Sequence, residues 1–348
     1  MTSRPKALPV FPTTVVGSYS VPEWLERVKT DYYQRRISSE YLYEIYDVAI
    51  KAALKDQERA GLDIVSDGEL RRDNDIDYLL VKIPGIVVPK TAKANYYDYY
   101  ETAVTHPLPG GAEGSLGLAE DFRFTRENTD RQIKFSFTGP FSLAQRTRNE
   151  AYPDRADLVR SLAGSLNAEA HRLVAAGAAM LQIDEPFLAG YPEQAGLAIE
   201  AINIVTKDVE ANWALHVCYG NRYARPSWEG HYDFLFPAVL DARVDQLVLE
   251  FARKGYDDLA LFRRYDWPGS LGLGVIDVKN EDVESSSVVA QRIRRALDHL
   301  PAESLVINPD CGLRHLPPAV ARAKLRAMVA GASEVRREQG QPAPSAEE

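Results

Sequence analysis

Residues 157–186 read DLVRSLAGSLNAEAHRLVAAGAAMLQIDEP, and this stretch holds one complete repeat of the fold. Apolar residues recur at helical spacing from Asp157 to Ala176, and Gly177 follows as a typical helix end. A short apolar run, Met180–Ile183, comes next and ends in the polar group Asp184-Glu185-Pro186. A helix joined by a short turn to a buried strand predicts a parallel βα unit.

The same pattern recurs along the whole chain. Apolar runs typical of buried strands occupy Thr13–Val16, Leu62–Val65, Ile133–Phe137, Met180–Ile183, Ala214–Cys218, Gln246–Phe251, Leu271–Ile276 and Leu305–Ile307. Helical patterns occupy Ser39–Ala60, Asp157–Ala176, Pro192–Glu210, Val283–Leu300 and Pro318–Val335. Eight strands alternating with helices predict an α/β protein with a closed (β/α)8 TIM barrel. An open doubly wound sheet is the alternative, but no Gly-x-Gly-x-x-Gly opens the first helix.

One interval breaks the alternation. Residues 76–130, approximately, separate the second and third predicted strands, which is far more than one helix needs. We interpret this interval as an insertion, either near one mouth of the barrel or against its outer wall. The expected organisation is a single zinc-containing barrel domain over residues 1–335 and a disordered polar tail over residues 336–348.

Composition limits the classes of function. The chain has 348 residues, 45% hydrophobic and 26% charged, with a net charge of −9, which is typical of a folded globular protein. No Lys/Arg stripe indicates a nucleic-acid partner, and no apolar run is long enough to span a membrane. The N-terminus lacks the apolar core of a secretory signal, so we expect a cytoplasmic protein.

Four residues at predicted strand ends suit a metal ion. His216 and Cys218 lie two residues apart at the end of the fifth strand, so both point to the same side of it. Glu250 ends the sixth strand, and Cys311 follows the eighth. Two thiolates, an imidazole and a carboxylate suit tetrahedral Zn²⁺. The alternative is two buried cysteines and a hydrogen-bonded core histidine, which is the commoner role of each residue taken alone.

Several motifs, in order, resemble those of a known family. They are Val16-Gly17-Ser18, Ser66-Asp67-Gly68-Glu69 with Arg72 and Asp73, Thr138-Gly139-Pro140, Gln182-Ile183-Asp184-Glu185-Pro186, His216-Val217-Cys218-Tyr219, Leu249-Glu250 and Asn308-Pro309-Asp310-Cys311-Gly312-Leu313. Together they make the chain similar to the catalytic C-terminal barrel of cobalamin-independent methionine synthase. The resemblance runs from about residue 11 to about residue 335.

This resemblance implies a zinc-dependent methyltransferase that activates homocysteine as a thiolate and methylates it to methionine. It implies that His216, Cys218, Glu250 and Cys311 hold the zinc. It further implies that Ser18, Glu69 and Asp184 hold the amino-acid part of homocysteine. Glu250 is the hardest of the zinc ligands, so we expect the incoming sulfur to displace it.

The identity of the methyl donor is left open by the sequence. The family has a histidine shortly after the aspartate of strand seven, where this chain has Asp277 and then Lys279. We expect these two residues to relay a proton to the leaving group. The family's second, N-terminal barrel is not present in this sequence, so the donor is either a methyl folate or an unidentified donor, free or protein-bound. The tyrosine-rich insertion, with Trp228 and Trp267, offers rings on which a pterin could stack.

Other functions fit parts of the pattern. A related barrel opens epoxides with the thiol of coenzyme M, and Arg71, Arg72 and Lys279 suit that sulfonate. Glu69 and Asp184 favour an amino-acid thiol instead. A catalytically silent zinc- or thiol-binding protein would not need Asp184. A decarboxylase on a similar barrel would leave the pair His216 and Cys218 unexplained.

Overall fold

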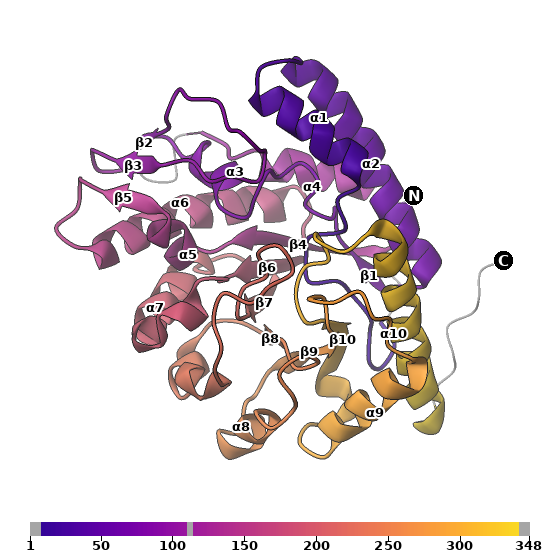
Figure 1. Cartoon of the computed structure of the whole chain (residues 1–348). Coiled ribbons are helices and arrows are strands. Elements are labelled where there is room, and N and C mark those ends of the chain that lie inside the picture. The colour runs from indigo at the N-terminus through magenta and orange to yellow at the C-terminus, as the bar shows by residue number, and fades with distance from the viewer. Residues whose placement is uncertain (1–7, 110–113, 341–348) are drawn as a thin grey trace.

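Seven parallel strands form the centre of the molecule, hydrogen-bonded in the order β1-β4-β6-β7-β8-β9-β10 (Figure 1). The computed structural model describes residues 8–109 and 114–340. All seven strands coincide with predicted apolar runs, and they are β1 (Ile64–Val65), β4 (Gln132–Thr138), β6 (Met180–Asp184), β7 (Asn212–Val217), β8 (Gln246–Leu249), β9 (Ser270–Ile276) and β10 (Leu305–Pro309). The prediction of an α/β TIM barrel is confirmed.

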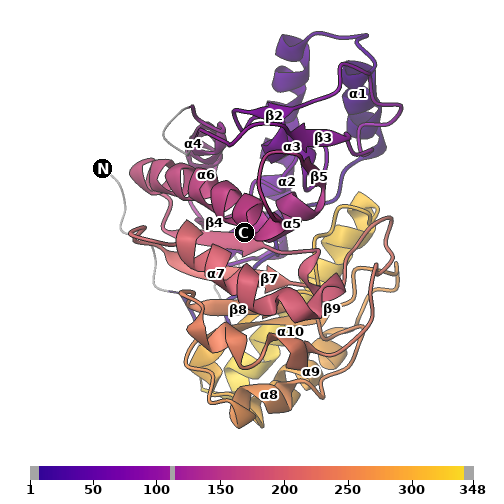
Figure 2. The same ribbon diagram turned by 90° about the vertical axis from the view of Figure 1, so that its left-hand side faces the viewer.

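Helices surround this sheet on its outer side (Figures 1 and 2). They are α2 (Ser39–Ala60), α4 (Leu118–Glu127), α5 (Pro140–Gln145), α6 (Arg155–Ala175), α7 (Ala195–Val205), α8 (Leu259–Arg264), α9 (Ser286–Leu297) and α10 (Pro318–Glu338). Their ends follow from local chemistry. The Ser38, Asp154 and Ser285 side chains each accept a backbone N–H in the first turn of α2, α6 and α9.

The first predicted strand, Thr13–Val16, forms only an isolated parallel bridge, between Thr13 and Ile307. Its backbone still closes the barrel. Thr14 N donates to Ile307 O at 2.9 Å on the β10 side, and Ile64 N donates to Thr13 O at 3.1 Å on the β1 side. This segment therefore takes the place of the eighth strand of the barrel, although it is too short to count as a strand. Because it comes first in the chain, we call it the first stave.

A buried arginine fixes this stave to the last helix. Arg336, in α10, donates to Val10 O at 2.8 Å and to Phe11 O at 2.7 Å. It also pairs with the Asp63 carboxylate at 2.6 Å, and that carboxylate accepts both the N–H and the hydroxyl of Thr13 at 2.8 Å. The barrel is thus closed by a charged network as well as by backbone bonds.

The insertion lies between β1 and β4. It contains α3 (Asp77–Leu80), β2 (Ile86–Val87), β3 (Thr102–Val104) and α4. β2 pairs antiparallel with β3, and β3 pairs parallel with β5 (Thr147–Asn149), forming a small second sheet beside the barrel. Helix α1 (Glu23–Tyr33) forms a hairpin with α2 that rises beyond the ring of helices (Figure 1).

Short 3-10 helices occupy several of the connections. They are η1 (Leu188–Gly190), η2 (Pro192–Gln194), η3 (Tyr232–Leu235), η4 (Ala238–Asp241) and η5 (Ala302–Ser304). The predicted helix over 192–210 is therefore shorter than expected, since η2 and α7 together end at Val205.

The expected disordered tail from residue 336 is wrong in its first residues. Helix α10 continues to Glu338, because Arg336 is fully buried and its last turn is needed to reach the first stave. Residues 341–348 lie outside the described part of the chain.

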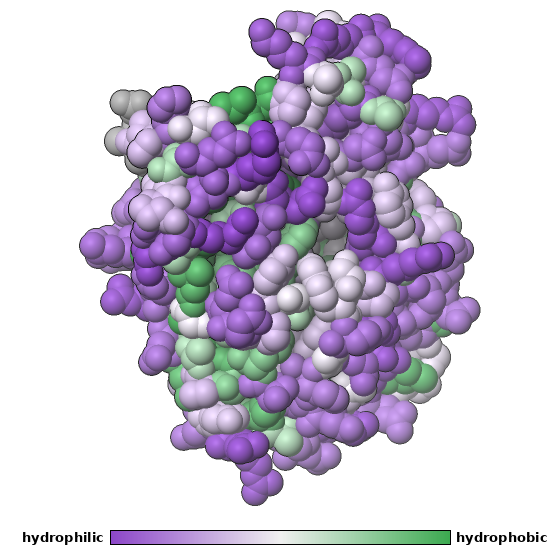
Figure 3. Space-filling view, turned by 60° about the vertical axis from the view of Figure 1, so that its left-hand side comes forward, coloured by the Kyte–Doolittle hydropathy of each residue, from purple (hydrophilic) through white to green (hydrophobic). Residues whose placement is uncertain are grey.

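Among the described residues, no helix is both long and apolar enough to cross a membrane. The face drawn in Figure 3 is mostly hydrophilic, and hydrophobic residues show mainly in its recessed parts.

We predict that Arg336→Ala lowers the free energy of unfolding by about 3–5 kcal/mol, because it leaves a largely buried Asp63 carboxylate without its cation. Arg337→Ala is the matched control, since Arg337 is exposed one residue later, and we expect a change within about 0.5 kcal/mol. Urea denaturation of both variants measures the difference. Equal losses would mean that the network does not close the barrel.

Candidate metal and substrate site

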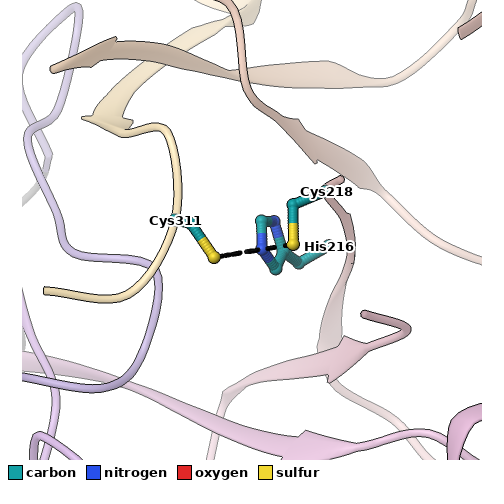
Figure 4. Close-up of side chains that lie close together, drawn as sticks. All are labelled: His216, Cys218 and Cys311. Atoms are coloured by element: carbon teal, nitrogen blue, oxygen red, sulfur yellow. Dashed lines mark hydrogen bonds between the residues drawn. The ribbon is translucent and has the colours of Figure 1, made fainter. Parts of the chain in front are cut away.

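Three potential metal ligands meet at the C-terminal ends of the strands (Figure 4). His216 and Cys218 come from the end of β7, and Cys311 follows β10. Cys311 Sγ lies 3.5 Å from Cys218 Sγ and 3.6 Å from His216 Nε2. The sequence predicted this convergence, because parallel strands of a barrel all end at one rim.

The spacing of these atoms fits a tetrahedral zinc ion. With Zn–S bonds of about 2.3 Å and a Zn–N bond of about 2.0 Å, two sulfurs would lie about 3.8 Å apart and a sulfur and a nitrogen about 3.5 Å apart. The structure has almost these separations already. His216 Nδ1 lies 2.9 Å from Val248 O and can donate to it, which turns the free Nε2 toward the sulfurs. The side chains of His216, Cys218 and Cys311 therefore have the spacing and the orientation that a bound zinc ion requires.

The two thiols share one hydrogen bond. The hydrogen bond between Cys311 Sγ and Cys218 Sγ, together with the nearby His216 imidazole, holds the pKa of Cys311 well below its ordinary value. The same bond, together with burial, raises the pKa of Cys218. Cys311 is thus the first sulfur available as a thiolate ligand.

Glu250, the fourth predicted ligand, does not belong to this cluster among the described residues. Its carboxylate is fully buried and is held by two cations. Oε2 accepts from Lys279 Nζ at 2.8 Å, and Oε1 accepts from Arg253 Nη2 at 3.1 Å. Whether Glu250 also binds the metal stays a prediction.

A glycine and an aspartate position the backbone beside Glu250. Asp310 accepts the backbone N–H groups of Phe251, Ala252 and Arg253 at 2.8–2.9 Å. Burial raises the pKa of Asp310 to about 7. A Cβ at Gly274 would lie 2.3 Å from this carboxylate, so only glycine leaves room for it.

A pocket opens beside the three ligands. Among the described residues it is lined by Val16, Gly17, Ser18, Glu69, Asp75, Tyr97, Thr138, Asp184, Pro186, His216, Cys218, Asn221, Cys311, Gly312, Arg314 and His315. The three residues predicted to hold the amino-acid substrate, Ser18, Glu69 and Asp184, therefore share one pocket with His216, Cys218 and Cys311. Their roles in binding stay predictions.

Glu69 is held in place by its neighbours. Its backbone is in the left-handed region, with φ of 56°. Its carboxylate accepts from Ser136 Oγ at 2.7 Å and pairs with Arg72 at 3.2 Å. A Cβ at Gly17 would lie 2.4 Å from Glu69 Oε1, so the first stave must carry glycine here. The carboxylate is thereby fixed toward the pocket.

Asp184 is a buried carboxyl of the pocket whose pKa lies above its ordinary value. Burial raises its pKa to about 7. Gln182 Nε2 donates to Asp184 Oδ1 at 2.6 Å and to Val16 O at 2.8 Å, so it links β6 to the first stave across the barrel interior. A cation entering the pocket would favour the ionised form of Asp184.

The predicted proton relay lies outside the pocket lining. Asp277 accepts from Lys279 N at 2.8 Å and from the Asn280 side chain, so it caps a turn. Burial disfavours the charge on Lys279, but Glu250 outweighs this effect and raises its pKa above the ordinary value. Lys279 is therefore the counter-ion of Glu250 in this structure, and it could act as an acid only after separating from Glu250.

Sequence reasoning missed four pocket residues: Asp75, Asn221, Arg314 and His315. Arg314 and His315 directly follow the predicted Asn308–Leu313 motif, so its extension by two residues would have found them. Tyr97 comes from the tyrosine-rich insertion, which places that part of the insertion at the pocket. Trp267, suggested as a stacking ring, lies just before β9 and thus at the opposite rim.

Comparisons with known proteins place the chain in one family over nearly its whole length. Residues 11–334 match the family model described as cobalamin-independent synthase, catalytic domain. A methionine synthase of Saccharolobus islandicus (strain L.S.2.15 / Lassen #1) is 36% identical over 331 residues, which cover 95% of this chain and 96% of that protein. A methionine synthase of Sulfurisphaera tokodaii is 34% identical over 337 residues, with 95% and 94% covered.

Solved structures show the same fold. A B12-independent methionine synthase from Shewanella sp. W3-18-1, in complex with selenomethionine, superposes with a TM-score of 0.82 at 27% identity and covers 95% of this chain and 99% of that one. A Listeria monocytogenes protein described as a putative vitamin-B12 independent methionine synthase gives a TM-score of 0.73 at 20% identity, again with 95% and 99% covered.

We predict that Lys279 and Glu250 are energetically coupled. Lys279→Gln should lower the free energy of unfolding by about 3 kcal/mol, since it leaves one oxygen of a buried carboxylate unpaired. The double variant with Glu250→Gln should lose less than the sum of the two single variants, by about 1–3 kcal/mol. Urea denaturation in the presence of a chelator measures all three. Additive losses would mean that the ion pair does not form.

Proposed function

Because the chain belongs to the cobalamin-independent methionine synthase family, we propose that it methylates the sulfur of homocysteine through zinc held by His216, Cys218 and Cys311. The chain is a methyltransferase of this family. One observation carries the finer proposal: three zinc-type donors and two carboxylates, Glu69 and Asp184, line a single pocket. We also propose that the barrel and its insertion act as one domain.

Zinc bound at this site would hold the substrate sulfur as a thiolate, because coordination lowers the pKa of a thiol. Three protein ligands leave one tetrahedral position for that sulfur. Glu250 remains a candidate for the fourth position before the substrate arrives. It would have to leave Lys279 and Arg253 to take it, so the structure supports the three-residue set more directly.

The carboxylates suit the ammonium group of an amino-acid thiol. Asp184 ends β6 and Glu69 follows β1, with β4 between the two strands, and both carboxylates line one pocket. The buried Arg314 gives the same pocket a cation for the substrate carboxylate. The Shewanella relative binds selenomethionine, an amino acid of the size of the proposed product. Coenzyme M has a sulfonate and no ammonium group, so it would offer neither carboxylate a cation.

We propose that the methyl donor is a methyl folate or an unidentified donor, free or protein-bound. A leaving nitrogen needs a proton in this reaction. Asp277 and Lys279 lie outside the pocket lining, so as relays they would act only after Lys279 separates from Glu250.

We predict about one zinc per chain in the wild type and little in Cys218→Ser or Cys311→Ser, since each variant removes one of three ligands. Glu250→Gln should keep its zinc. Metal analysis after gel filtration measures the content, and thermal unfolding checks that each variant is folded.

Zinc-edge X-ray absorption then tests the thiol. Homocysteine should add one sulfur to the zinc shell, and coenzyme M should not. A full zinc content in both cysteine variants would reject the site. Binding of coenzyme M alone would favour the epoxide-opening reaction, and loss of zinc in Glu250→Gln would add Glu250 to the ligands.

We predict a pH dependence that Asp184 controls. Burial raises its pKa to about 7, so the carboxylate that meets the ammonium group forms only as the pH rises through that value. Affinity for methionine should therefore increase between about pH 6 and about pH 8 and then level off. Methionine has no thiol proton, so calorimetry with it isolates this contact.

Asp184→Asn is the matched control for this measurement. It should bind methionine about tenfold or more weakly at high pH, because a charge-assisted contact is lost, and its affinity should change little with pH. Parallel pH profiles of the variant and the wild type would exclude Asp184 as the ammonium partner.

A further inference from the structure

One carboxyl group of the pocket has no part in the proposed binding of the amino-acid thiol. Asp75 lines the same pocket as Cys218 and Cys311. It belongs to the loop that follows β1, and β4 and β6 separate β1 from β7, which leads into Cys218. Asp75 and Cys218 therefore belong to different walls of one pocket, with room for a reacting group between them.

Hydrogen bonds on both sides fix the backbone at Asp75. Asn74 Oδ1 accepts from Ile76 N at 2.9 Å and from Asp77 N at 2.8 Å, which closes a turn around the residue. Thr138 Oγ1, at the end of β4, donates to the carbonyl oxygen of Asp75. Its side chain is thus placed by two separate elements, as the precise positioning of a reacting group requires.

The two carboxyl oxygens of Asp75 differ in their surroundings. Oδ1 accepts from the Tyr99 hydroxyl at 2.8 Å. Within the described part of the chain, no other residue donates a hydrogen bond to Oδ2 or forms an ion pair with it. Because Oδ1 already serves as an acceptor, a proton on this carboxyl group resides on Oδ2, where it is free for a ligand of the pocket.

The surroundings of Asp75 favour the protonated form. Burial raises the pKa of Asp75, and the charge of Glu69 adds to this effect, whereas the Tyr99 hydroxyl and Arg314 oppose it. Burial also raises the pKa values of Tyr97 and Tyr99, so both hydroxyl groups keep their protons. Asp75 can therefore hold a proton at a pH at which an ordinary aspartic acid has lost it.

We propose that Asp75 is the catalytic acid of the methyl transfer, and that its Oδ2 proton passes to the nitrogen that leaves the methyl group. This inference rests on the proposed function, because it adds an acid to that reaction. Asp75 lines the pocket and has no cationic partner to leave first, whereas Lys279 lies outside the lining and is paired with Glu250.

The step balances without a further reactant. The substrate sulfur, as a thiolate, gives an electron pair to the methyl carbon, and a C–S bond forms. The C–N bond breaks, its electron pair stays on nitrogen, and the nitrogen takes the proton of Asp75. The products are a thioether, an N–H amine and the Asp75 carboxylate, which regains a proton from water. An acid in this position typically accelerates a reaction by about 10²–10⁴-fold.

Two methyl donors with different leaving groups test the proposal on the zinc-loaded protein with homocysteine. 5-Methyltetrahydrofolate leaves through a nitrogen that needs a proton, whereas methyl iodide leaves as iodide and needs none. Asp75→Asn should lower the rate of methionine formation from the folate by about 100-fold or more. The rate from methyl iodide, corrected for the reaction without protein, should change by less than about twofold.

Asp98→Asn is the matched control. Asp98 lies in the same insertion as Tyr99 and accepts from Asn95 N at 2.9 Å, but it is not among the pocket-lining residues. We expect less than about a twofold change with either donor. Zinc content and the Kd for methionine, measured by calorimetry, should match the wild type in both variants, because neither residue holds the metal or the amino acid.

The pH profile separates an acid from a residue that only supports the structure. The ratio of the folate rate to the methyl iodide rate cancels pH effects on the sulfur. This ratio should fall as the pH rises through the pKa of Asp75, since the acid form is lost. Tyr99→Phe removes a hydrogen bond that favours the carboxylate, so the fall should move to higher pH, and Asp75→Asn should abolish it.

Four results would overturn the proposal: an unchanged folate rate in Asp75→Asn, equal losses with both donors, a pH profile that Tyr99→Phe does not move, or a wild type that uses methyl iodide but not the folate. The last result would leave the proposed activation of homocysteine intact. A wild type that is inactive with both donors would reject the proposed function as well. If Asp75→Asn does not fold, the profile of Tyr99→Phe decides alone.

Discussion

The closure of the barrel by the first stave is the contact on which the site depends. Thr13 and Thr14 connect to Asp63, Ile64 and Ile307, and two short segments continue from these bonds toward the rim. One leads to Ser18 and the other to Cys311. They meet where Leu313 N donates to Ser18 O at 2.8 Å and where a Cβ at Gly312 would lie only 1.9 Å from Ser18 Oγ. A loss of closure would thus separate a predicted substrate contact from a metal ligand.

The charged side chains at the C-terminal rim form two groups, one beside the thiols and one on the other side of the pocket. On the metal side, Glu250 is neutralised by Lys279 and Arg253, so the thiols lie close to a balanced ion cluster. On the proposed substrate side, Glu69 and Asp184 line the pocket, and Arg72 and Arg314 lie 3.2 Å and 4.0 Å from the Glu69 carboxylate. An ammonium group therefore finds its partner away from the sulfurs. Under the proposed function, this arrangement would orient an amino-acid thiol with its sulfur toward His216, Cys218 and Cys311.

The sequence predicted the features that depend on local pattern and on topology. Apolar runs located seven strands, and the rule that parallel strands end together placed His216, Cys218 and Cys311 in one cluster. The contacts of Glu250 could not be predicted, because they depend on which of several nearby cations reaches a buried carboxylate. Likewise, the helical character of Arg336 depends on a tertiary contact with Val10 and Phe11. Composition near the chain end indicates only a polar segment.

The short distance between the two sulfurs also has a redox consequence. Atoms 3.5 Å apart need little movement to become a disulfide once an oxidant removes two electrons. Such a bond would tie the end of β7 to the segment after β10 and remove two of the three metal donors at once. A metal bound as proposed would engage both sulfurs and so prevent this reaction. The metal-free chain would then be the form open to oxidation, and metal loading would protect the two sulfurs before any substrate binds.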